Sequence, residues 1–189
     1  MLIEFAPLKA TKKYSLMSNT IFPRPIAWIS TEDSGVVNLA PFSYFAPISS
    51  EPPCVIVSIA KKEDGMPKDT FANIMKHKKC TINLAHKELL SQLQNSAEEL
   101  PKNESEPEKF GIEMRNVLDG YPPMVAHAKC ALFCTYVQSV NLNNEYEPII
   151  LEIRQMYVED ACVGERLHIK LDNIGRVGMD FLVDATRTR

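Results

Sequence analysis

The chain has 189 residues, a net charge of −3 and a pI near 5.8. Hydrophobic residues make up 45% and charged residues 24%, the ordinary balance of a globular protein. This length predicts one domain over residues 1–189 that needs no metal or disulfide to fold, and the lack of a basic surplus argues against a nucleic-acid binder.

The N-terminal 20 residues are mixed in composition and predict an arm with one short strand. Glu4 and Pro7 leave no room for the apolar core of a secretory signal, and no later run approaches the roughly 18–20 apolar residues that cross a bilayer. We therefore expect a cytoplasmic protein without a membrane partner.

Short strands are predicted at residues 26–29 and 36–40, joined by a polar turn that ends in Gly35. A third strand, at 54–59, follows two prolines, which mark its start. After a loop at 61–68, a helix is predicted to begin near Asp69 and Thr70.

The second half of the chain continues this pattern. A strand is predicted at 80–85, a helical period at 89–97, and an exposed acidic connection at 99–109 with room for a turn of helix. Two longer strands near 129–140 and 148–159 and a last one near 164–170 complete the set. Because strands and helices do not alternate, we predict a mainly β fold, an antiparallel barrel with inserted helices packed outside.

The cysteines and histidines carry no metal signature. The count of five cysteines is odd, no C-x-x-C motif occurs, and each cysteine lies in or beside an apolar run. We interpret them as buried free thiols of a reducing compartment. The histidines are scattered, and no P-loop, dinucleotide fingerprint, zinc motif or serine elbow is present.

One segment with chemical potential is the start of the helix near Lys68. A helix start offers unpaired N–H groups and about half a positive charge, to which Lys68 and the Thr70 hydroxyl add a phosphate-binding set. The alternative is ordinary capping by Asp69 or Thr70 with a solvated Lys68. Without further context, capping is favoured.

A second segment, residues 38–45, alternates small or polar side chains with aromatic ones. Such a wall suits a flat heteroaromatic ring, which needs backbone polar groups at its edge and apolar contact on its face. Pro41 is expected to break the strand there and free neighbouring backbone groups. A plain strand end with core aromatics explains the composition equally well.

Taken together, three segments resemble the flavin reductase-like family, also called the flavoredoxin group, of FMN-binding split barrels. The matching residues run from Arg24 to Thr31 and from Asn38 to Phe45, and continue with Lys68-Asp69-Thr70, Asn73-Ile74 and Asn83-Leu84. Further on, residues 174–178 are similar to the closing stretch of the family, although Met179 stands where its second glycine is usual.

The resemblance implies a homodimer with one FMN per subunit at the interface. It implies that the flavin is lined by Ser30, Thr31, Asn38, Leu39, Ala40 and Ser43, and that its phosphate side is held by Lys68, Asp69, Thr70 and Asn73. With the family in view, phosphate binding replaces capping as the preferred interpretation of the helix start. Arg24 is open to a phosphate or a dimer role, Arg176 to the cofactor or a neighbouring carboxylate, and Trp28 is expected to pack in the barrel.

The leading function is then an NAD(P)H-dependent flavin reductase, in which FMN carries the redox chemistry and no side chain is required as an acid or base. The first alternative is a flavoredoxin-type electron carrier that exchanges electrons with protein partners. The second is a non-catalytic flavin-binding module. A redox protein or a monooxygenase is a candidate acceptor.

Overall fold

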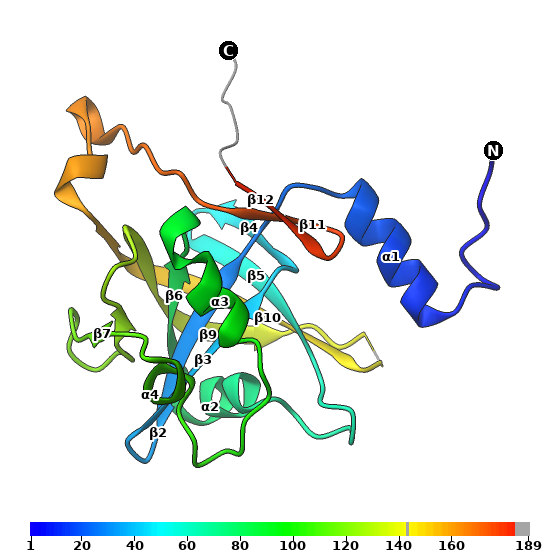
Figure 1. Ribbon diagram of the computed structural model, residues 1–189, viewed down its shortest axis with the longest axis horizontal. Coiled ribbons are helices and arrows are strands. Elements are labelled where there is room, and N and C mark those ends of the chain that lie inside the picture. The colour runs from blue at the N-terminus through cyan, green and yellow to red at the C-terminus, as the bar shows by residue number, and fades with distance from the viewer. Residues whose placement is uncertain (143, 184–189) are drawn as a thin grey trace.

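A seven-stranded antiparallel sheet dominates the computed structural model, which describes residues 1–142 and 144–183 (Figure 1). Its strand order is β3-β2-β6-β9-β10-β5-β4. The strands are β2 (Ala27–Asp33), β3 (Val36–Phe42), β4 (Phe45–Ser50), β5 (Pro53–Ala60), β6 (Lys79–Leu84), β9 (Cys130–Ser139) and β10 (Tyr146–Val158). The two edge strands, β3 and β4, are joined by residues 43–44 alone, and the Ser58 N–H donates to the Tyr44 carbonyl oxygen at 2.8 Å, which continues the β4–β5 pairing.

Helices and small sheets surround this wall. The helices are α1 (Ala10–Thr20), α2 (Asp69–His77), α3 (Leu90–Asn95) and α4 (Glu106–Phe110), with 3-10 turns η1 (Lys87–Leu89), η2 (Asp160–Cys162) and η3 (Glu165–Leu167). One small sheet joins β1 (Arg24–Pro25), β11 (Gly175–Val177) and β12 (Asp180–Leu182), and another joins β7 (Met114–Arg115) and β8 (Met124–Val125). The prediction of a mainly β fold with inserted helices is confirmed.

Two buried clusters follow from the alternation of side chains along β2. Ala27 and Ile29 belong to a cluster formed with β5, β6, β9, β10 and α2. Trp28, between them in the sequence, points the opposite way, into a cluster with Leu39 and Leu93 that lies beneath α3 and the segment 112–128. Trp28 is fully buried, as expected, and its indole N–H donates to the Ser96 hydroxyl oxygen at 2.8 Å.

Two predicted strands are absent from the described residues. The N-terminal arm forms α1 instead, which docks by stacking Tyr14 on Tyr44 at 5.9 Å and by accepting a hydrogen bond from Gly178 N–H at the Ser18 carbonyl, 2.8 Å. Residues 164–170 turn sharply at Arg166, where φ is +54°, so they form η3 and only an isolated bridge rather than a strand.

Two finer expectations were wrong as well. Pro41 does not break its strand: it lies within β3 opposite Trp28, and an edge strand tolerates the missing N–H because one side has no partner strand. The connection 99–109 is not uniformly exposed, since Glu106 at the start of α4 is 4% exposed. Among the described residues, no helix is long and apolar enough to cross a membrane.

Candidate functional site

Two adjoining cavities flank the end of β3, and both are lined by Pro41 and Ala97. The smaller, of about 70 Å³, lies against the start of α2 and is lined by Lys68, Thr70 and Glu106 among others. The larger, of about 460 Å³, extends toward β11 and β12 and is lined by Arg176 and Phe181. We call this pair of cavities the groove. Lys68, Asp69 and Thr70, which were predicted to hold a phosphate, lie at one end, and Ser43 and Arg176 lie at the other.

The start of α2 is left without a side-chain cap. Lys68 occupies the N-cap position and makes no capping hydrogen bond. Asp69 instead pairs with Lys62 at 2.9 Å, and the Thr70 hydroxyl donates to the Asn38 amide oxygen at 2.7 Å. The first N–H groups of a helix have no acceptor within the helix, so this end retains its partial positive charge. Capping by Asp69 or Thr70, the simpler interpretation of the sequence, is therefore wrong.

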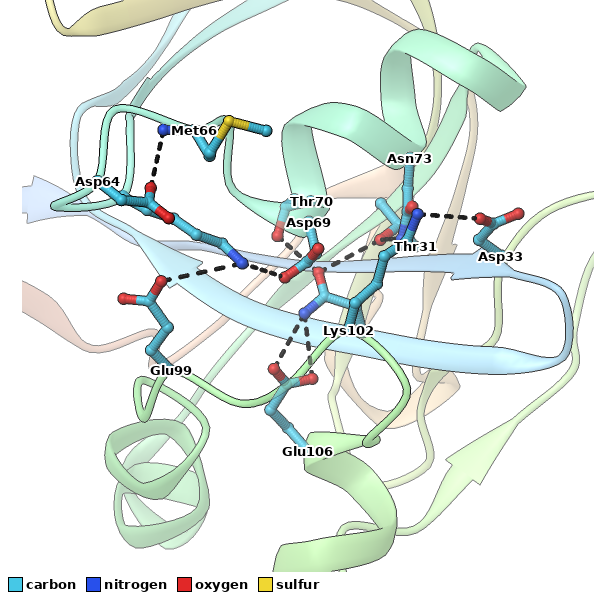
Figure 2. A network of polar contacts seen from close by, with 12 residues as sticks. Thr31, Asp33, Asp64, Met66, Asp69, Thr70, Asn73, Glu99, Lys102 and Glu106 are labelled. Carbon is cyan, nitrogen blue, oxygen red and sulfur yellow. Dashed lines mark hydrogen bonds and ion pairs between the residues drawn. The ribbon is translucent and has the colours of Figure 1, made fainter.

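A buried polar network supports the helix start from behind (Figure 2). Thr31 and Asn38 lie opposite each other on β2 and β3. The Asn73 side chain on α2 donates to the Thr31 hydroxyl oxygen at 3.1 Å, while Thr70 donates to Asn38. These bonds fix α2 on the sheet and set the position of its first turn.

Glu106 completes this network and was not predicted. The Asn38 side-chain amide donates to both of its carboxylate oxygens, at 3.0 and 3.1 Å, and the Leu39 backbone N–H donates to one of them at 2.9 Å. Burial raises the pKa of the Glu106 carboxyl, and these donors oppose the rise. The Ser105-Glu106-Pro107 pattern could have predicted a helix start, but no local signal links Glu106 to Asn38 across 68 residues.

Ion pairs hold residues 98–106, which we call the strap, across the smaller cavity. Lys62 bridges Asp69 and the strap residue Glu99, at 2.9 and 3.9 Å, and the Asp69 contact raises the pKa of Lys62. Lys102 approaches Asp33 at 3.7 Å (Figure 2). Lys68, by contrast, makes no ion pair with any residue that the structure describes, so its charge remains available to the groove.

Asp33 anchors the other end of this arrangement. It accepts hydrogen bonds from Lys76 at 2.6 Å and His77 at 2.9 Å, both at the end of α2. These two bonds hold the pKa of the Asp33 carboxyl well below its usual range. Asp33 thus ties the C-terminal end of α2 to the hairpin, while the network above ties its start.

Two arginines lie on neighbouring strands near the far end of the groove: Arg176 lines the larger cavity, and Arg24 lines a separate cavity between α1 and β4. Arg24 is 6% exposed and donates to the Ser43 hydroxyl oxygen at 2.9 Å and to the Gly178 carbonyl oxygen at 3.0 Å. Arg176 lies opposite Arg24 in register, and its guanidinium stacks on the Phe181 ring at 4.2 Å. Burial, and then the charge of Arg24, lower the pKa of Arg176.

Not every predicted site residue points its side chain into the groove. Ser30 and Leu39 are fully buried on the opposite face of β2 and β3, where the Ser30 hydroxyl donates to the Pro123 carbonyl oxygen at 2.6 Å. Thr31 and Asn73 lie behind the groove wall as network residues. The cavities themselves are lined by the predicted residues Asn38, Ala40, Ser43, Lys68, Asp69, Thr70 and Arg176.

Residues 17–173 match the model of the flavin reductase like domain. The chain belongs to the flavin reductase-like family. Members of this family occur in distant bacteria: an uncharacterised protein of Deinococcus radiodurans is 34% identical over 93% of this chain and 81% of its own length. One from Aquifex aeolicus is 30% identical, over 91% of this chain and 89% of its own.

Solved structures share the fold of this flavin reductase-like chain. Nitrilotriacetate monooxygenase component B from Bacillus cereus superposes with a TM-score of 0.93 at 24% identity, over 100% of this chain and 98% of that one. The flavoredoxin of Desulfovibrio vulgaris (Miyazaki F) gives 0.80 at 13% identity, over 100% and 96%. At these identities the likeness establishes the split-barrel fold, as the sequence predicts.

Proposed function

We propose that this flavin reductase-like protein binds FMN and reduces it with NAD(P)H. The observation that carries the proposal is the uncapped start of α2 beside Lys68, which has no ion pair among the described residues, at one end of a groove that widens into the cavity of about 460 Å³. An anion at the narrow end and a planar ring in the wide end match the two parts of a flavin nucleotide.

The residues present fit this group. Lys68, the Thr70 hydroxyl and the free N–H groups of α2 would hold the phosphate, and Ala40 and Pro41 would line the path to the ring. The strap closes the narrow end through Glu99 and Lys62. The narrow end, of about 70 Å³, is where the phosphate of FMN would lie.

Bound flavin would supply the redox chemistry, two-electron exchange with a nicotinamide. The chain would contribute position and electrostatics. The Glu106–Asn38–Thr70 network holds the helix start in one arrangement, so its N–H groups need no reorganisation to meet an anion. Pro41 and Ala97 line both cavities and would offer apolar contact to the flavin where the two cavities meet.

We propose that the protein is a homodimer. A cavity of about 370 Å³ with almost wholly apolar walls lies between α1 and the edge strand β4, lined by Met17, Ile21, Tyr44 and Phe45. Residues 46–50 of β4 are exposed along one sheet edge, which is unusual for an isolated subunit. A second copy of the chain would cover both the cavity and the sheet edge. Analytical ultracentrifugation tests the dimer: the wild type should sediment as a dimer and Ile21→Glu as a monomer.

Localisation and partners follow from the same proposal. The structural relative from Bacillus cereus is a monooxygenase component, so a monooxygenase that consumes reduced flavin is one candidate acceptor for this chain. A redox protein is the other. Both would be met in the cytoplasm, where nicotinamide nucleotides are available and where the free cysteines stay reduced.

Absorbance of the purified protein tests the function. We expect flavin bands that bleach on addition of NADH or NADPH and return in air. A protein that is bleached by dithionite and by neither nicotinamide is a carrier like the flavoredoxin that shares its fold. A colourless protein that retains no flavin bands after it is mixed with FMN and the free FMN is removed by gel filtration would refute the proposal.

A further inference from the structure

Glu106 is a buried carboxylate in the wall of the smaller cavity. It is 4% exposed and lines that cavity together with Lys68 and Thr70. The groups that donate to it, the Asn38 side-chain amide and the Leu39 backbone N–H, carry no charge. Among the residues that the structure describes, no lysine, arginine or histidine forms an ion pair with it. A buried charge held by neutral groups alone is costly, so this carboxylate gains from taking up a proton.

The charges that face Glu106 do not neutralise it. Asp69 at the start of α2 is paired with Lys62 at 2.9 Å, and Glu99 reaches the same lysine at 3.9 Å. Strand β3 and helix α3, which pack against α4, contribute no charged residue. The other charged groups around it are Glu98 and Lys109, paired at 2.7 Å, Lys102 and Asp33, 3.7 Å apart, and Glu104, Glu108 and Lys68. Burial raises the pKa of the Glu106 carboxyl, and the charge of Asp69 adds to the rise.

A phosphate in the smaller cavity would meet this carboxylate. The Thr70 hydroxyl donates to Asn38 at 2.7 Å, and Asn38 donates to Glu106 at 3.0 Å, so only two hydrogen bonds separate Glu106 from the start of α2 (Figure 2). A phosphate monoester loses its second proton near about pH 6, so at neutral pH it is a dianion. Two acids at close range titrate as a pair, because the repulsion between their charges raises the affinity of the pair for one proton.

We propose that Glu106 and the phosphate of a bound flavin nucleotide share one proton, which the complex takes up from solvent as the nucleotide binds. This inference rests on the proposed function, because it needs a phosphate monoester in the smaller cavity. The proton bonds to one of the two acids, no electron moves, and their combined charge changes from about −3 to −2. Lys68 and the uncapped start of α2 then face a smaller negative charge. Glu106 therefore selects the protonated form of the phosphate and sets the pH range in which the cofactor binds.

Proton uptake makes the affinity for FMN depend on pH. A ligand that binds together with one proton binds tenfold more weakly for each unit by which the pH rises above the range where the free groups are protonated. We expect FMN to bind about five- to tenfold more weakly per unit between about pH 7 and 9. Riboflavin, which has no phosphate, should bind equally well over this range.

Calorimetric titration of the wild-type protein measures the proton directly. FMN is titrated near neutral pH in several buffers that differ in their heat of ionisation, and the dependence of the observed heat on the buffer gives the number of protons taken up. We expect about one proton for each FMN bound and none for each riboflavin. This measurement does not depend on the folding of any variant.

Glu106→Gln is the matched variant. Glutamine, like a protonated glutamate, keeps one acceptor oxygen and places a donor at the other position. The variant should bind FMN without proton uptake, and at about pH 8 its affinity for FMN should equal or exceed that of the wild type. Glu108→Gln, at an exposed position on the same helix, should retain the proton uptake. Thermal unfolding of each variant checks that it folds.

The outcomes separate this inference from the proposed function. FMN binding that is equally tight at low and high pH and takes up no proton would overturn the inference and leave the proposed function standing. Proton uptake that persists in folded Glu106→Gln would show that another group takes the proton, and would overturn the assignment to Glu106. A wild-type protein that binds neither FMN nor riboflavin at any pH would refute the proposed function, and this inference with it.

Discussion

Replacing Lys68 with methionine separates phosphate binding from ring binding. Methionine keeps the apolar stem and removes the charge, and in residues 1–142 and 144–183 Lys68 has no ion pair whose loss would confuse the result. A hydrogen bond to a charged group contributes about 1.5–3 kcal/mol, and half-burial reduces this to about 1–2 kcal/mol. FMN should then bind about 5- to 30-fold more weakly.

Flavin fluorescence quenching measures this loss, with riboflavin as the matched ligand because it lacks the phosphate. Riboflavin affinity should change by less than about twofold. Lys61→Met, in the same loop but facing Glu147, should leave both ligands unaffected. An equal loss of FMN and riboflavin affinity in Lys68→Met would show that Lys68 does not contact the phosphate.

Three further outcomes test the rest of the structure. Glu106→Ala leaves buried N–H groups without an acceptor, so it should lower the free energy of unfolding by about 2–4 kcal/mol and the Tm by roughly 5–15 °C. Glu108→Ala, at an exposed position on the same helix, should leave both almost unchanged. The pKa of Asp33 is lowered, so its stabilisation is present above the ordinary value of 3.8 and is lost as the pH falls below it. Asp33→Asn should accordingly lower the urea midpoint at neutral pH and match the wild type in strong acid. Burial raises the pKa of Cys130 to about 11. A thiol reagent should therefore modify only the half-buried Cys162 in the folded protein, and all five cysteines after unfolding. Rapid modification of Cys130 in the folded protein would contradict its burial.

Local patterns were sufficient for most of the fold. The strands of the main sheet alternate or form short apolar runs between turn residues, and the start of α2 was correctly placed at Asp69. Helix α1 was not predicted because it has no continuous apolar stripe. Distant contacts hold it instead: Tyr14 stacks on Tyr44, and the Ser18 carbonyl accepts a hydrogen bond from the Gly178 N–H. The strand predicted at 164–170 does not form, because Arg166 and Leu167 have positive φ angles, which the local sequence does not indicate.

The site was predictable in part for the same reason. Lys68 and Thr70 are two positions apart in the sequence, so their meeting at a helix start needed no long-range information. Glu106 reaches Asn38 only because the strap folds back over β3, and nothing in either neighbourhood encodes that contact. The directions of Ser30 and Leu39 depend on which face of the sheet the outer helices cover, which strand alternation alone does not decide.

The hydrogen bond between Trp28 and Ser96 gives the molecule an optical reporter. The chain has a single tryptophan, which is shielded from water, and its partner Ser96 also lines the smaller cavity. Its emission should be blue-shifted and should overlap the absorption of any flavin seated in the groove. Ultraviolet excitation would thus follow occupancy by energy transfer, without a label or a chemical reaction.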